Sequence, residues 1–366
     1  MRVYVNTADR SETAFDKIKY FANDSTVRGM FWDEPSLSEI DLIAKQVEKY
    51  NSIANGKNLF VNLLPSVTFS SITKYKEYLN KYCGSVLSKV TTGEKWISAD
   101  RYLLTYDSKG NKCLDENWLA DVQAVAEAAK VNGLKKNFFI QTMPYGAKNG
   151  VSSGAVVGSR DRVPTYEDIR LQEYALMAFG YDGFSLFCYA TPSVTDNEFS
   201  SEQYAMIGRD GAKTDIYASV AKANKEILNF DHVLKQFNWQ GVFTCNAGAT
   251  LRSTTTTVPT TSNASFKNLD RISFKNVSCL KSLKADKDTL FGYFKDDSGN
   301  DGIMAVNYNE TSKNLTDTVT FTFDQTKYNR VVCYENGIMT YKSLVNGEIS
   351  LTLGAGAGVF VIPYAE

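Results

Sequence analysis

The sequence lacks the residues that most nucleophilic and metal sites require. Its single histidine, His232, lies in a helical stretch past the other candidate residues, so Ser-His-Asp and Cys-His catalysis have no imidazole. The cysteines are scattered, with no C-x-x-C pair and no histidine nearby, which disfavours a zinc site and assigns no disulfide. They are Cys83, Cys113, Cys188, Cys245, Cys279 and Cys333. We therefore expect neither a metal nor another cofactor.

Long apolar runs and an excess of one charge are also missing. No run approaches the roughly 20 residues that span a bilayer, and the start of the chain does not have the pattern of a signal peptide. Forty Lys and Arg residues against forty-one Asp and Glu residues give a net charge of −1, which favours neither nucleic acid nor an anionic membrane as a partner. With 43% hydrophobic and 22% charged residues, the 366-residue chain is typical of a globular protein with two domains.

Strand-like and helix-like segments alternate over the first 236 residues. Nearly continuous apolar runs predict strands at residues 3–6, 29–34, 59–64, 96–104, 137–143 and 183–190. Helical spacing predicts helices at residues 11–22, 72–90, 118–131, 166–179 and 214–236, and one that Ser36 or Ser38 caps and that runs to about residue 54, with a Gly/Ser-rich loop at 146–160. This alternation favours parallel β/α units with right-handed crossovers, of which six can be counted.

The pattern changes at about residue 237. Helical periodicity gives way to short β-rich segments separated by turn signals such as Asn336-Gly337 and Asn346-Gly347. We expect residues 237–366 to form an antiparallel β-sandwich that follows an α/β domain at residues 1–236.

Polar side chains stand at the carboxyl ends of successive predicted strands, where a parallel α/β architecture keeps its chemistry. They are Asp33, Glu34, Asn62, Asp100, Arg101, Tyr102, Gln141 and Tyr189. Carboxylates, amides, phenols and one arginine, without histidine or lysine, suit a neutral polyhydroxylated ligand. Cleavage of a glycosidic bond needs two carboxyl groups, one protonated and one ionised, and this set contains three.

The roles of these carboxylates stay open from the residues alone. Neighbouring side chains on a strand point to opposite faces, so Asp33 and Glu34 enter one pocket only if a bulge intervenes. Asp100 could supply the second carboxyl, or could instead cap a helix or pair with Arg101. Asp33 could equally cap the next helix while Glu34 is solvated.

Aromatic residues near the strand ends could stack on sugar rings. The candidates include Trp32, Trp96, Tyr102 and Tyr189, although each suits the hydrophobic core at least as well.

Five blocks of the sequence resemble the clan A type of (β/α)8 glycoside hydrolases, and specifically the family 42-like β-galactosidase group of bacterial polysaccharide-degrading proteins. The blocks are GMFWDEPS (29–36), VNLLP (61–65), SADRY (98–102), FIQ (139–141) and AFGYDGFSLFCYATP (178–192). The resemblance covers residues 1 to about 236, and β-sandwiches often close such enzymes.

The resemblance implies a (β/α)8 barrel in which Glu34, after the fourth strand, is the acid/base. The six visible strands would be the third to the eighth, so we expect an N-terminally incomplete barrel whose signal peptide would also be lost. It further implies an extracellular or cell-surface location. Two departures stand out: Asp33 replaces the usual Asn before the acid/base, and the seventh strand offers Gln141 and no carboxylate.

Two functions follow. The first is a glycoside hydrolase acting on an oligosaccharide or polysaccharide, with Glu34 as general acid/base, Asp100 or Asp33 as second carboxyl, and Asn62, Tyr102, Gln141 and Tyr189 orienting the sugar. The second is a non-catalytic carbohydrate-binding or scaffold protein derived from such a barrel.

Overall fold

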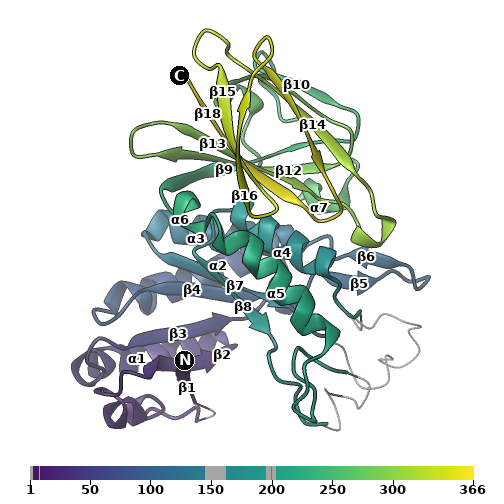
Figure 1. The fold of residues 1–366 in the computed structure, drawn as a ribbon. Helices are drawn as coiled ribbons and strands as arrows, with labels where there is room; N and C mark the ends of the chain where they lie inside the picture. The colour runs from purple at the N-terminus through teal and green to yellow at the C-terminus, as the bar shows by residue number, and fades with distance from the viewer. Residues whose placement is uncertain (1–2, 8, 145–161, 195–198, 200–202) are drawn as a thin grey trace. The chain divides into compact units, whose positions relative to one another are not determined.

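The computed structural model describes residues 3–7, 9–144, 162–194, 199 and 203–366 (Figure 1). The chain divides into two compact units, each made of several segments. The first unit contains Met1–Arg101, Ala120–Phe139 and Tyr181–Ser185, and the second contains Tyr102–Leu119, Ile140–Gly180 and Leu186–Glu366. The Gly/Ser-rich loop predicted at 146–160 lies outside the described residues.

A parallel sheet of six strands organises the first unit. Its order is β1 (Val3–Asn6), β2 (Val27–Asp33), β3 (Asn58–Leu63), β4 (Trp96–Asp100), β7 (Lys135–Gln141) and β8 (Gly183–Phe187). The register from β1 through β7 is parallel throughout, which confirms the predicted parallel strands. In the described part of the chain β1 and β8 are the two edges of this sheet, and the closed barrel of eight strands is not present.

Helices cover one face of this sheet because alternate strand residues on that face are apolar and fully buried, as Met30 and Trp32 are. The helices are α1 (Leu37–Ile53), α2 (Ile72–Ser85) and α3 (Trp118–Asn132), with the 3-10 helices η1 (Asp16–Tyr20), η2 (Ser66–Thr68) and η3 (Leu87–Lys89). A capping box begins α1: the hydroxyl of Ser36 accepts from the N–H of Glu39, whose carboxylate accepts from the N–H of Ser36. The predicted helix at 11–22 is wrong, since only η1 forms there.

Two antiparallel sheets form most of the second unit. One contains β10 (Thr250–Arg252), β11 (Leu280–Ala285), β14 (Asp317–Phe323) and β17 (Glu348–Leu353). The other contains β16 (Ile338–Ser343), β15 (Arg330–Glu335), β18 (Gly358–Tyr364), β13 (Asp301–Asn307), β12 (Thr289–Asp296) and β9 (Phe237–Cys245). The sheets share one core, in which the rings of Phe291 and Phe321 lie 6.3 Å apart. The antiparallel strands expected after residue 237 are therefore confirmed.

The second unit also contains two long helices, α4 (Tyr166–Ala178) and α5 (Asp215–Leu228). Its shorter elements are the hairpin β5 (Leu104–Tyr106) and β6 (Lys112–Leu114), α6 (Asp231–Leu234), α7 (Ala264–Lys267), η4 (Phe274–Asn276) and η5 (Thr311–Lys313). A Cβ added to Gly292 of β12 would lie 2.0 Å from the carbonyl oxygen of Ala178, so the backbone of α4 touches the sheet. This packing places α4 with the antiparallel sheets, and the domain boundary at residue 236 stays a prediction.

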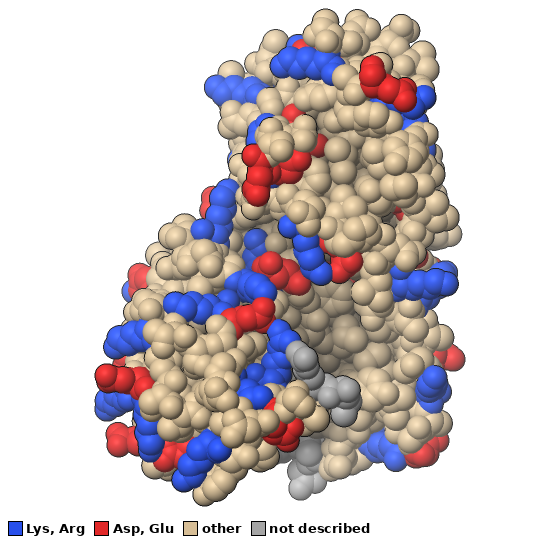
Figure 2. Space-filling view, turned by 60° about the vertical axis from the view of Figure 1, so that its left-hand side comes forward, with Lys and Arg blue, Asp and Glu red and all other residues tan. Residues whose placement is uncertain are grey.

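Charged side chains of both signs are interspersed over the face that Figure 2 shows. This mixture agrees with the net charge of −1 and forms no extended field of one sign. No helix among the described residues is both long enough and apolar enough to cross a membrane.

Candidate functional site

Glu34 has an unusual backbone conformation for a residue with a side chain. Its φ of 45° lies in the left-handed region, which costs about 1 kcal/mol or more for a non-glycine residue and is often found at functional sites. The N–H of Glu34 donates to the carbonyl of Asn62 across 2.8 Å, and its side chain is exposed. Because β2 ends at Asp33, the alternation of a strand does not extend to Glu34, so it no longer forces the two carboxylates to opposite faces.

A buried phenol holds the backbone beside Glu34. The hydroxyl of Tyr78, on α2, donates to the carbonyl of Pro35 across 2.6 Å and accepts from the N–H of Leu64 across 3.2 Å. Tyr78 is 1% exposed. It thereby ties together the segments that follow β2 and β3, one of which carries Glu34.

Two of the predicted catalytic carboxylates act on this phenol. Burial is the main cause of the raised pKa of Tyr78, and the negative charges of Glu34, Glu39 and Asp100 add to it. Asp100 ends β4 and is 9% exposed.

A chain of hydrogen bonds crosses the sheet and ends on the third carboxylate. Ser185 donates to Asn137 Oδ1 (3.3 Å), Asn137 to Ser98 Oγ (3.0 Å), Ser98 to Asn62 Oδ1 (3.2 Å) and Asn62 to Asp33 Oδ1 (3.1 Å). We call these five residues the polar chain. Every donor points toward Asp33, and hydrogen bonds aligned in this way polarise one another. The polar chain therefore holds the Asp33 carboxylate in one orientation.

Aromatic rings lie next to the polar chain on the same face of the sheet. They line a cavity of about 280 Å³ together with Asn137 and Ser185. The rings of Phe31 and Phe60 are 6.0 Å apart, and those of Phe60 and Trp96 are 6.4 Å apart. We call this space the aromatic cavity. Ring faces bordered by hydroxyl and amide groups suit a sugar, which has apolar ring faces and a polar rim.

Sequence reasoning selected Asp33, Asn62 and Trp96 but missed the residues that join them into the polar chain and the aromatic cavity: Ser98, Asn137, Ser185, Phe31 and Phe60. The available signal was the period of two: Phe31 and Phe60 precede Asp33 and Asn62 by two residues, and Ser98 precedes Asp100 by two. Side chains at this spacing share a face of the sheet with the residue at the strand end.

The structure corrects the role predicted for Trp32. Its side chain is fully buried, with its ring centroid 5.3 Å from that of Phe15 and 4.8 Å from the guanidinium carbon of Arg10. No face of this ring is open to a sugar, because Trp32 lies on the helix-covered face of the sheet.

The structure also corrects the role predicted for Gln141, which belongs to the second unit. Its side chain is fully buried, accepts from the N–H of Leu104 across 3.0 Å and donates to the carbonyl of Met143 across 3.2 Å. Its backbone exchanges hydrogen bonds with the amide of Gln172. Gln141 thus orders the local chain and is not available to orient a substrate.

The remaining predicted residues divide between the units. Asp33, Glu34, Asn62 and Asp100 belong to the first unit. Tyr102 and Tyr189 belong to the second unit, where Tyr102 is 7% exposed with its ring 5.4 Å from that of Phe187, and Tyr189 is 59% exposed. Their roles as sugar ligands stay predictions.

Arg101, the residue after Asp100, pairs with Asp121 and Ser66. Its guanidinium lies 3.5 Å from the carboxylate of Asp121 on α3 and donates to the hydroxyl of Ser66 across 3.0 Å.

No group of three His, Cys, Asp or Glu side chains within the described residues is arranged to hold a metal ion.

Comparisons with known proteins give only weak likenesses. No model of a protein family matches the chain, and no curated protein matches it. An Anoxybacillus α-amylase is 8% identical, with 96% of this chain and 62% of that chain covered and a TM-score of 0.49. An α-amylase from Geobacillus thermoleovorans is 10% identical, with 97% and 64% covered and a TM-score of 0.46.

A family 44 endoglucanase from Clostridium acetobutylium is also 10% identical, with 95% of this chain and 69% of that chain covered and a TM-score of 0.40. This chain thus spans less than two thirds of the length of both α-amylases. At these identities and TM-scores the likenesses do not establish a shared fold or activity.

Proposed function

We propose that this protein is a glycoside hydrolase in which Glu34 is the general acid/base. The observation that carries the proposal is the position of these acids: Asp33 and Glu34 stand at the end of β2 and Asp100 at the end of β4, on the carboxyl edge of one parallel sheet. The left-handed backbone of Glu34 supports it, because strained residues of this kind cluster at functional sites.

In this reaction Glu34 protonates the glycosidic oxygen as the bond to the anomeric carbon breaks. A second carboxylate, from Asp100 or Asp33, attacks the anomeric carbon or removes a proton from the attacking water. Asp33 suits this role because the amide of Asn62 fixes its carboxylate. Asp100 suits it because it ends β4, which lies two strands from β2 in the same parallel sheet.

The aromatic cavity and the polar chain provide the sugar-binding surface of the proposal. Ring faces at Phe31, Phe60 and Trp96 would stack on the sugar, and Asn137 and Ser185 would bind its hydroxyl groups. An oligosaccharide or polysaccharide is therefore the proposed substrate.

Within clan A we propose the family 42-like group, on the strength of the five sequence blocks. One departure from the clan's pattern decides where the second carboxyl is sought. Gln141 stands where the clan has its nucleophile, and its buried amide excludes that role, so the second carboxyl is sought on β2 or β4.

The test is a screen of neutral polysaccharides and oligosaccharides for the release of reducing ends by the full chain. We expect release by the wild-type protein, and its loss in Glu34→Gln and in Asp100→Asn or Asp33→Asn. The matched control is Glu48→Gln, which changes an exposed glutamate on α1 and should keep the activity. Binding of a glycan without any release would contradict the proposal and favour a carbohydrate-binding protein.

A further inference from the structure

The aromatic cavity of the first unit has one charged side chain in its wall, Arg28. No carboxylate is among the described residues that line this cavity. The side chain of Arg28 is 38% exposed, so its guanidinium can meet a ligand. The cavity therefore offers a positive charge beside its aromatic rings.

Arg28 reaches the cavity because the pairing of β1 with β2 is irregular. Arg28 and Phe31 are three residues apart on β2, a spacing that places side chains on opposite faces of a regular strand. The register with β1 skips Arg28, since Val3 pairs with Val27 and the residue after Val3 pairs with Gly29. Arg28 is thus the extra residue of a bulge, a device that re-aims a side chain and is common next to functional sites.

The carboxylate that pairs with Arg28 is shared with a second cation. Glu94 accepts from Nη2 of Arg28 across 2.5 Å, from the ammonium of Lys135, and from the indole of Trp96 across 3.3 Å. The hydrogen bond from Lys135, with those from Trp96 and Arg28, lowers the pKa of Glu94 to about 2, so Glu94 is ionised at neutral pH. One negative charge therefore faces two positive charges.

Lys57 adds a third positive charge beside the start of β2. Its ammonium donates to two backbone carbonyl oxygens, and it lines a cavity of about 380 Å³ that Arg28 and Glu94 also line. The exposed carboxylate of Asp24 interacts with Lys57. Arg28, Lys57 and Lys135 against these two carboxylates leave a net charge of +1 at this end of the aromatic cavity.

A phenol beside Arg28 offers a further proton. The amide of Asn58 donates to the hydroxyl of Tyr4 across 3.0 Å, and the guanidinium of Arg28, which interacts with this phenol, is a donor as well. Neither group accepts the hydroxyl's own proton, so Tyr4 can donate it to a ligand. A ligand group that only accepts hydrogen bonds and is negatively charged, such as a carboxylate, matches these donors best.

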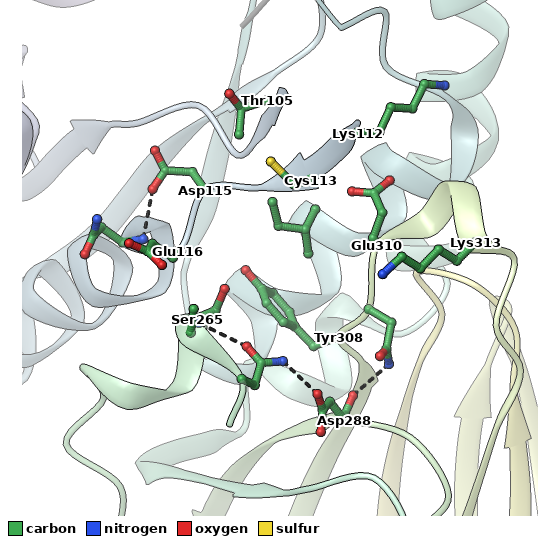
Figure 3. Close-up of a pocket in the computed structure, with 15 residues that line it drawn as sticks. Thr105, Lys112, Cys113, Asp115, Glu116, Ser265, Asp288, Tyr308, Glu310 and Lys313 are labelled. Atoms are coloured by element: carbon green, nitrogen blue, oxygen red, sulfur yellow. Dashed lines mark hydrogen bonds between the residues drawn. The ribbon is translucent and has the colours of Figure 1, made fainter. Parts of the chain in front are cut away.

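The larger cavity of the second unit has the opposite charge balance. Its volume is about 630 Å³ (Figure 3). Its described lining contains two lysines, Lys112 and Lys313, and four acids, Asp115, Glu116, Asp288 and Glu310. Like charges repel, so a ligand with a carboxylate is not expected in this second cavity.

We propose that the aromatic cavity binds a sugar that carries a carboxylate, a uronic acid, with Arg28 as the specificity-determining residue. This inference rests on the proposed function and narrows its substrate to a glycan that contains such an acidic sugar. Arg28 and Asp33 are five residues apart on β2, so the acidic sugar would bind roughly 15 Å from the proposed catalytic carboxylates. Contacts at such a distance add affinity, and glycans without the acidic sugar would still be cleaved, with a higher KM.

The test compares acidic and neutral glycans that are otherwise matched. Full-length Glu34→Gln protein is titrated by calorimetry with three pairs: trigalacturonic acid and its methyl ester, cellotriose oxidised at C6 and cellotriose, and xylotriose with and without a glucuronic acid branch. We expect the acidic member of at least one pair to bind about tenfold more tightly or better, the value of a hydrogen bond between charged groups.

Substitutions of Arg28 then locate this preference. Arg28→Gln, added to the Glu34→Gln protein, should reduce the preference about fivefold or more and leave the affinity for the neutral member unchanged. Arg28→Lys keeps the charge and should retain part of the preference. Arg252→Gln, the same change at an exposed arginine of the second unit, should leave it unchanged. Glu94 keeps its bond from Lys135 in these variants, and melting curves check that the fold is retained.

Three results would overturn the proposal: no acidic member binds more tightly than its neutral partner, the preference is the same with and without Arg28, or Arg252→Gln reduces it as much as Arg28→Gln does. Release of reducing ends by the wild type without any acidic preference would leave the hydrolase standing. An acidic preference without release would refute the hydrolase alone, so the two proposals fail separately.

Discussion

The hydroxyl of Tyr78 donates a hydrogen bond to the carbonyl of Pro35 across 2.6 Å, and this bond joins α2 to the residue that follows Glu34. Glu34 itself has a φ of 45°, a conformation that the surrounding structure must maintain. The phenol provides part of that support from a position that no ligand reaches, since it is 1% exposed. The backbone beside Glu34, the proposed general acid, is therefore held by a residue 44 positions away along the chain.

Tyr78→Phe tests this support. Removing the hydroxyl leaves the Pro35 carbonyl and the Leu64 N–H without their partner, and we expect a loss of about 1–3 kcal/mol in the free energy of unfolding. Because a misplaced catalytic group slows the reaction strongly, we also expect kcat to fall about tenfold or more. Tyr20→Phe, at an exposed tyrosine, is the control for both measurements. An unchanged kcat in a folded Tyr78→Phe protein would contradict the positioning role.

Ser98→Ala breaks the polar chain at its centre. Asn62 loses its donor and Asn137 loses its acceptor, so we expect a destabilisation of about 1–3 kcal/mol by chemical denaturation. The amide of Asn62 is then free to turn away from Asp33. We therefore expect kcat to fall by a larger factor than KM changes. Ser108→Ala, at an exposed serine, should change neither the stability nor kcat. A Ser98→Ala protein with full activity would show that the polar chain does not position Asp33.

Glu173 should make stability depend on pH. It is fully buried on α4, and neither carboxylate oxygen has a hydrogen-bond partner among the described residues. Burial, followed by the charge of Glu226, raises the pKa of Glu173 well above its ordinary value of 4.5, although Arg170 opposes this. As the pH rises above 4.5 the unfolded chain loses this proton first, so the contribution of Glu173 to stability falls until the folded pKa is passed.

Glu173→Gln removes this titration. We expect the variant to equal or exceed the wild type by about 1–3 kcal/mol at mildly alkaline pH, and the difference to shrink toward pH 4.5. Urea denaturation across this range measures it. A difference that stays constant with pH would show that the carboxyl titrates normally.

Gly292→Ala tests the packing of α4 on β12. The added Cβ would lie 2.0 Å from the carbonyl oxygen of Ala178, closer than two non-bonded heavy atoms can approach. We expect a loss of about 3 kcal/mol or more, or failure to fold. Gly354→Ala, where the new Cβ meets no atom within 4 Å, should change stability little. Equal stability of the two variants would contradict the contact.

Much of the fold could be predicted from the sequence because local signals carry it. Continuous apolar runs indicated the buried parallel strands, and the Asn-Gly pairs indicated hairpin turns. Asn336 and Asn346 do adopt left-handed φ values, of 52° and 54°. The end of β4 at Asp100 and the contact of Gly292 with Ala178 were missed, since both depend on partners distant in the sequence.

The residue types of the candidate site could be proposed from the sequence, but the orientation of their side chains could not. Position at a strand end was enough to select Glu34, Asn62 and Asp100. It did not reveal that Trp32 faces the helices. Which alternate residues of a strand face the helices depends on which side of the sheet the helices cover. The left-handed backbone at Glu34 was also hidden, since that conformation is expected of glycine or asparagine and not of glutamate.

The central claim is that Glu34 donates a proton to the leaving group, and the dependence of the rate on that group tests it most directly. Glycosides with a nitrophenol leaving group need little protonation, whereas those with a sugar leaving group need it fully. We predict that Glu34→Gln lowers kcat/KM by about 10²–10⁴-fold on the sugar glycoside and far less on the nitrophenyl glycoside. Equal losses on both substrates, or full activity of Glu34→Gln on the sugar glycoside, would contradict the account.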